Sequence, residues 1–104
     1  MSSVAIVASA SGDTTIIAAV ATHRFYIKKL FLVTKGAVDV QFKSDTTVIT
    51  GVMGMAANGQ INITQVPNSD EALLIGHAIN KAFIINLSGA VVVGGFCQYD
   101  MKDG

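Results

Sequence analysis

The sequence predicts an all-β protein built as a two-sheet antiparallel β-sandwich of about eight strands. Val, Ile and Thr are plentiful, whereas Glu and Arg occur once each, and this bias favours half-buried strands over helices. Turn residues recur at roughly the 8 to 12 residue spacing that is typical of sandwiches and barrels. Between the turns, apolar and polar residues alternate with a period of two, which indicates strands with one buried face.

The chain length of 104 residues fits one domain. Residues 11–104 are expected to form a single β-sandwich domain, and residues 1–10 an N-terminal arm or a first strand. The apolar residues 4–10 follow no basic residue, and Ser9 interrupts them, so we expect no secretory signal.

The strands can be placed in order along the chain. Residues 24–33 form a long strand, and the adjacent Lys28 and Lys29 break its alternation, so a β-bulge is expected there. Residues 37–43 alternate cleanly between apolar and polar side chains, and residues 60–64 do the same. Both segments are therefore predicted to be strands with one face in the core.

Two near-continuous apolar runs, residues 83–87 and 91–96, are predicted to be strands that are covered on both faces. The second sheet would cover one face and another subunit the other. Ser88 and Gly89 form a tight turn between the runs, which would fix their register if they pair as a hairpin. Residues 69–78 begin like a helix but contain a glycine, and the strand-rich context favours a strand there.

The charge balance argues against several classes of partner. Hydrophobic residues make up 51% of the chain, charged residues 13%, and the formal net charge is zero. A neutral, weakly charged chain is not steered toward nucleic acid or an anionic membrane, so neither partner is expected. Its apolar stretches have the length of strands, not of membrane helices. Such a surface stays soluble more easily when part of it is buried in an oligomer.

The candidate metal and thiol ligands are scattered. His23 and His77 lie far apart, and a zinc site needs three or four ligands, so ordinary histidines are expected. A symmetric oligomer that gathers copies of one histidine on its axis is the one metal arrangement left open. One cysteine excludes an intrachain disulfide, and Cys97 in its apolar run is expected to be a buried hydrophobe.

The sequence predicts neither an enzyme nor a cofactor site. Several of the seven carboxylates fall in turns, where Asp serves local backbone hydrogen bonds. No Gly-x-Ser-x-Gly elbow occurs, and the glycine-rich segments match no phosphate loop or dinucleotide fingerprint. Those glycines are better explained by close strand packing or bulges.

Most aromatic residues are Phe within strand-like runs, which favours core packing over a sugar-binding platform. Met53 and Met55 lie in a Gly/Ala-rich segment. The two methionines there either provide adaptable apolar surface for a contact, or belong to a loop that folds over the end of the core.

Short turn motifs recur in residues 42–63 and 81–99. They are Ser44, Thr50-Gly51, Ala57-Asn58-Gly59, Asn86-Leu87-Ser88, Gly94 or Gly95, and Tyr99. In these motifs the chain resembles small jelly-roll proteins and domains of tailed-bacteriophage particles. The resemblance implies a jelly-roll sandwich that assembles as a homotrimer on the virion. It also implies a capsid cement or decoration protein or, as the alternative, a tail or fibre module that binds a carbohydrate or host surface.

From this resemblance we expect a non-enzymatic virion protein on the capsid surface. Its expected partners are further copies of itself and the major capsid protein. The apolar side chains expected to make assembly contacts are Val4, Ile6, Met53, Met55, Val91 and Val93. Deleting residues 1–10 is expected to weaken capsid attachment while leaving the fold intact.

Overall fold

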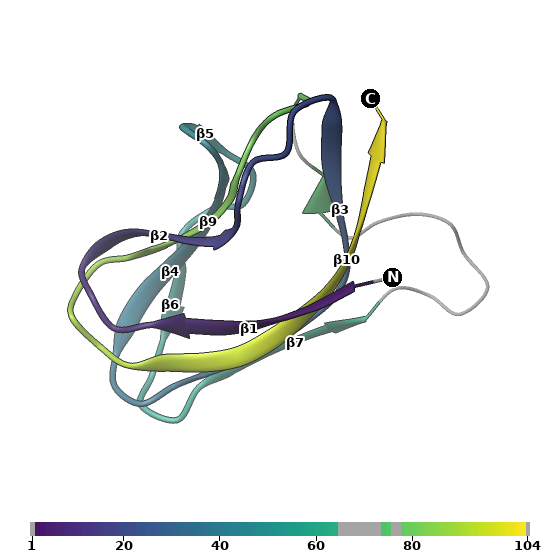
Figure 1. Ribbon diagram of the computed structural model, residues 1–104. Coiled ribbons are helices and arrows are strands. Elements are labelled where there is room, and N and C mark those ends of the chain that lie inside the picture. Colours follow the sequence, from purple (N-terminus) through teal and green to yellow (C-terminus); the bar gives the residue numbers. More distant parts are fainter. Residues whose placement is uncertain (1, 65–73, 76–77, 104) are drawn as a thin grey trace.

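The computed structural model describes residues 2–64, 74–75 and 78–103, which form strands and no helix. The strands are β1 (Ser2–Ala8), β2 (Gly12–Ile17), β3 (His23–Thr34), β4 (Val38–Ser44), β5 (Thr47–Val48), β6 (Met53–Met55), β7 (Gln60–Thr64), β8 (Leu74–Ile75), β9 (Phe83–Leu87) and β10 (Val93–Asp103). They build two antiparallel sheets that lie in two layers (Figure 1). The predicted all-β sandwich is confirmed.

In each sheet, strands from the first part of the chain lie next to strands from the last part. The first sheet has the order β1-β10-β3-β7, with β8 also paired to β3, and the second has the order β2-β9-β4-β5, with β6 also paired to β4. The first four strands alternate between the sheets, and the strand at each end of the chain lies in the first sheet. The edge strands β1 and β2 therefore lie on one side of the sandwich.

The N-terminal residues belong to the sheet. Strand β1 pairs with β10 along its whole length, from Ser2 opposite Tyr99 to Ala8 opposite Val93. Ile6 and Ala8 are buried in the core between the sheets. Residues 2–8 therefore form a first strand, which is one of the two predicted alternatives. Because Ile6 and Ala8 belong to the core, the structure leads us to expect that deletion of residues 1–10 destabilises the fold.

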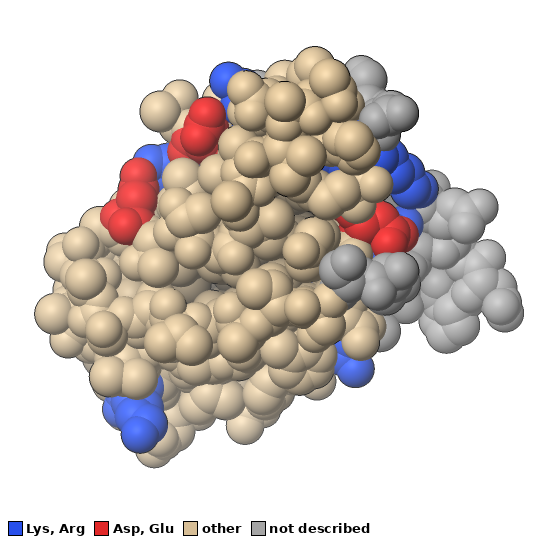
Figure 2. All heavy atoms as spheres, viewed as in Figure 1, with Lys and Arg blue, Asp and Glu red and all other residues tan. Residues whose placement is uncertain are grey.

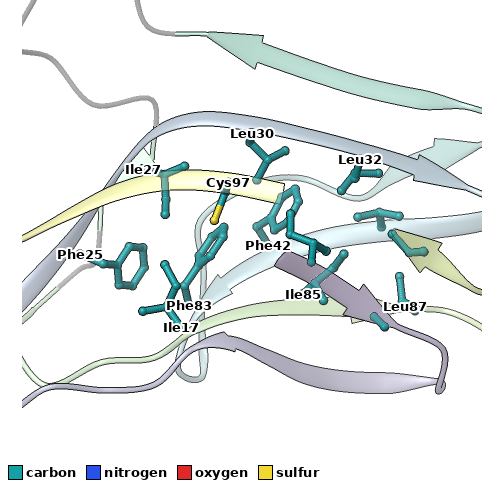
Figure 3. Close-up of a cluster of buried hydrophobic side chains, with 14 of the residues drawn as sticks. Ile17, Phe25, Ile27, Leu30, Leu32, Phe42, Phe83, Ile85, Leu87 and Cys97 are labelled. Carbon is teal, nitrogen blue, oxygen red and sulfur yellow. The ribbon is translucent and has the colours of Figure 1, made fainter. Parts of the chain in front are cut away.

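The core fills the space between the sheets with side chains from both (Figure 3). Phe83 on β9 lies at its centre, with its ring centroid 5.1 Å from that of Phe25 on β3 and 5.3 Å from that of Phe42 on β4. Phe25 comes from the first sheet and the other two rings from the second. The aromatic cluster thus ties the two layers together.

The predicted β-bulge is confirmed at the paired lysines. Along the β10–β3 ladder Gln98 lies opposite Lys29, whereas Tyr99 lies opposite Ile27, so Lys28 is the extra residue on β3. An extra residue restores the inward phase of the apolar side chains after an interruption in a strand. The bulge lets β3 contribute core residues on both sides of the lysines.

The two strands that flank Ser88 and Gly89 do not pair as a hairpin, because β9 and β10 lie in different sheets. The connecting residues cross from one layer to the other. Ser88 is held at the start of this crossing by Asp39 on β4. The Ser88 amide donates to the Asp39 carbonyl at 3.1 Å, and the Asp39 amide donates to Ser88 Oγ at 2.9 Å.

Two further predictions change in the structure. Met53 and Met55 lie in the short strand β6 and not in a loop. Within residues 69–78, Leu74 and Ile75 form strand β8. The rest of that segment up to Gly76, and His77, lie outside the described residues.

Candidate assembly surface

The reactive side chains of the described residues do not converge on one place. No group of three or more His, Cys, Asp or Glu that could hold a metal ion occurs among residues 2–64, 74–75 and 78–103. His23 makes local contacts, its Nδ1 lying 3.2 Å from both Thr22 Oγ1 and the Ala21 carbonyl oxygen. Cys97 is buried as predicted, and desolvation raises the pKa of its thiol to about 11.

Two further kinds of site were sought in the described part of the chain. No pocket is found in it. None of its residues forms a helix that is long and apolar enough to cross a membrane.

A polar cluster on the second sheet joins three neighbouring strands. Asp13 on β2 accepts a hydrogen bond of 2.7 Å from Asn86 Nδ2 on β9 and one of 3.0 Å from Lys43 Nζ on β4. These hydrogen bonds from Asn86 and Lys43 lower the pKa of the Asp13 carboxyl. Each side chain of the cluster is satisfied by its neighbours, so the cluster stabilises the sheet.

The side of the sandwich formed by β1 and β2 is almost free of charge. Residues 1–22 contain one charged side chain, Asp13. Figure 2 shows this side, on which the charged atoms lie toward the rim and uncharged residues cover the middle. Edge strands of monomeric proteins are usually protected by charges, prolines or bulges. Strand β1 has none of these, because its sequence is uncharged and its register with β10 is regular.

An apolar patch continues from β1 across the outer face of the first sheet. In one cross-strand row Ala5 lies opposite Phe96, which lies opposite Phe31. The two phenylalanine ring centroids are 6.1 Å apart. We call the following residues the outer patch: Ala5, Val7, Phe31, Val33, Val92 and Phe96.

The next row of the outer patch contains a gap. Gly94 lies between Val7 on β1 and Val33 on β3, and no atom lies within 4 Å of the position that a Cβ would take there. Val7 is 74% exposed, and Val92 before β10 is 48% exposed. The outer patch is therefore apolar surface that a partner can reach.

Of the six side chains predicted to make assembly contacts, two belong to the core. Ile6 is 1% exposed and Val93 is fully buried, so neither side chain offers free surface on a single copy of the chain. The other four are partly buried and pack against the core: Val4, Met53, Met55 and Val91.

Three exposed valines are sequence neighbours of the predicted side chains. Val7 follows Ile6, Val92 precedes Val93, and Val52, which is 63% exposed, precedes Met53. Successive side chains on a strand point to opposite faces, so a shift of one residue exchanges core for surface. The predicted segments thus carry exposed apolar surface, but on the alternate residues.

Some of the phenylalanine side chains lie in the core between the sheets, and others lie on the outer face of the first sheet. Phe25 is core, as are Phe42 and Phe83 of the second sheet, which matches the prediction of core packing. Phe31 and Phe96 are partly exposed on the outer face, where Lys29 Nζ lies 5.7 Å from the Phe96 ring centroid. For these two residues the prediction of core packing is wrong.

Comparison with protein-family models, curated proteins and solved structures finds no match to this chain. The case for its function therefore comes from its own fold and surface.

Proposed function

We propose that this protein is a non-enzymatic structural component of a virion, a cement or decoration protein that stabilises a capsid as a homo-oligomer. The observation that carries the proposal is the uncharged β1–β2 side of the sandwich together with the outer patch. A free-standing monomer rarely exposes an unprotected edge strand beside apolar surface, whereas an assembly protein covers both with other protein.

The strand order supports the jelly-roll part of the proposal. If β5 and β6 count as one interrupted strand and the two-residue β8 is set aside, eight strands remain. Their order is first-eighth-third-sixth in one sheet and second-seventh-fourth-fifth in the other. Two sheets of four strands with this interleaving are the pattern of a jelly roll. The jelly-roll virion proteins that the turn motifs resemble imply a trimer, and we include the trimer in the proposal.

The proposed mechanism of stabilisation is burial of area at capsid junctions. Apolar side chains of the outer patch gain about 25 cal/mol for each Å² removed from water. A protein that bridges neighbouring capsid subunits adds this gain to contacts that must otherwise resist internal pressure alone. The neutral charge suits such contacts, because few ionised groups have to be desolvated.

The test is addition of the purified protein to capsids that lack it, taken from the phage that encodes it. We expect saturable binding and a higher temperature of capsid disruption. Val92→Lys, in the outer patch, should weaken binding at least tenfold. The matched control is Val48→Lys, which alters an equally exposed valine (51%) on β5 of the other sheet and should bind like the unaltered protein. Absence of binding by the unaltered protein would contradict the proposal.

The second candidate function is a tail or fibre module that binds a carbohydrate. One observation favours it: Tyr26, Phe31 and Phe96 lie partly exposed on the same sheet face, and aromatic platforms bind sugar rings. Against it, lysine side chains already lie over two of the rings, Lys102 over Tyr26 at 5.1 Å and Lys29 over Phe96. Binding to a glycan array that Phe96→Ala abolishes would favour this candidate over the first.

A further inference from the structure

We propose that two copies of this chain pair through strand β1, antiparallel about a two-fold axis, and so join their first sheets into one continuous sheet. Strand β1 is the edge of its sheet, and among the described residues it pairs with β10 alone. Its other side presents backbone amide and carbonyl groups that a second extended strand can satisfy. The inference concerns self-assembly and holds whether or not the protein binds a capsid.

The register of this pairing follows from two requirements. Inward side chains must meet inward ones, because a one-residue slip would turn the partner's core residues toward solvent. Full overlap of Ser2–Ala8 with its copy then centres the two-fold axis on Ala5. In this register Val4 lies opposite the partner's Ile6 on the inner face, and Ser3 lies opposite the partner's Val7 on the outer face.

The occupant is a second copy because β1 carries no charge that would repel its own copy, and its side chains fit one another in size. Like charges directly opposite each other are the usual obstacle to self-pairing of an edge strand, and residues 2–8 contain no charge. Opposite the exposed Val7 the register places the small Ser3, and Ala5 meets its own copy. No large side chains therefore face each other across the outer side of the pairing.

The pairing also joins the two outer patches. Ala5 and Val7 belong both to β1 and to the outer patch, so the patches of two copies become continuous across the axis. A two-fold contact yields dimers when it acts alone, and it yields even-numbered assemblies when it links the proposed trimers. The oligomeric mass in solution is thus a direct readout that needs no capsid.

The test compares two double variants with the same number of substitutions at the same positions. Ser3→Lys/Val7→Lys places like charges opposite each other across the axis, whereas Ser3→Glu/Val7→Lys places opposite charges there. We expect sedimentation equilibrium to give the unaltered protein the mass of an even number of chains. The first double variant should have half that mass, and the second should keep the full mass. Val48→Lys, on the other sheet, should keep it too.

Circular dichroism and thermal unfolding show whether each variant is folded, and both altered side chains are exposed, so the fold is expected to persist. A monomer or an isolated trimer of the unaltered protein would overturn the inference. So would equal masses for the two double variants, because the register predicts opposite effects of the two charge pairs. Neither result would bear on capsid binding, which the Val92→Lys comparison tests separately.

Discussion

The side-chain amide of Asn86 donates a 2.7 Å hydrogen bond to Asp13 Oδ1. The two residues lie opposite each other on β9 and β2, and Lys43 on β4 adds an ion pair of 3.0 Å to the same carboxylate. Asp13 is the one charged residue among the first 22, and its charge is neutralised within the sheet. The edge strand β2 is thereby fastened to the sheet, and the one charge on β1 and β2 is paired with Lys43.

Stability should depend on pH through Asp13. Its pKa is lowered in the folded protein from the ordinary value of 3.8, so its contribution is present above that value and is lost as the pH falls through the folded pKa. We expect Asp13→Asn to unfold more easily at pH 7, by under about 1 kcal/mol because the pair is partly exposed. The difference in free energy of unfolding should shrink as the pH falls below 3.8 and through the folded pKa. A difference that does not change with pH would show that charge is not its source.

Gly95 should resist any larger residue. It passes so close to β3 that an added Cβ would overlap the Phe31 carbonyl oxygen and lie 2.6 Å from Leu32 Cα. We expect Gly95→Ala to lower the free energy of unfolding by about 1–3 kcal/mol, as overpacking does. Gly94→Ala is the matched control, since its Cβ would meet nothing within 4 Å. Urea denaturation of both variants gives the comparison, and equal stabilities would refute the close approach.

Substitution of Phe83 should destabilise the protein strongly, because its ring contacts Phe25 from one sheet and Phe42 from the other. Phe83→Ala removes both contacts and leaves a cavity between the layers, at an expected cost of about 3–5 kcal/mol. Phe83→Leu should cost less, since it keeps most of the volume. A change below 1 kcal/mol for Phe83→Ala in urea denaturation would argue against the described core.

Deletion of residues 1–10 should destabilise the domain. It removes the whole β1–β10 ladder, exposes the edge of the long central strand β10, and takes Ile6 and Ala8 out of the core. We expect the truncated protein to aggregate or to unfold at a clearly lower temperature than the full chain. A truncated protein with unchanged thermal stability would show that the segment is an arm after all.

The fold class can be predicted from the sequence because the residue patterns that indicate a strand lie within the strand itself. Alternation in residues 37–43, the bulge at Lys28 and the burial of Cys97 each follow from neighbouring residues, and the structure confirms them. Pairing between strands is set by distant parts of the chain. Ser88 and Gly89 resemble a hairpin turn, yet the partners of β9 are β2 and β4, which precede it by dozens of residues.

The segments that the sequence predicts for assembly contacts carry exposed apolar side chains, but on residues next to the predicted ones. In a run such as Val91, Val92 and Val93, every residue is apolar, so the alternation that separates core from surface carries no signal. The structure shows which of these valines is buried: Val93 lies in the core and Val92 is exposed. The absence of charged residues before His23, apart from Asp13, is a signal in the sequence that could have pointed to the β1–β2 side.

Backbone amide exchange of β1 tests most directly whether the uncharged edge is covered by a second copy. Within residues 2–8, the amides that point away from β10 should exchange slowly with deuterium in the unaltered protein and at least ten times faster in Ser3→Lys/Val7→Lys. The amides of β9, inside the second sheet, should exchange alike in both proteins. Fast exchange along β1 in the unaltered protein, at concentrations where the oligomer is complete, would contradict pairing through this strand.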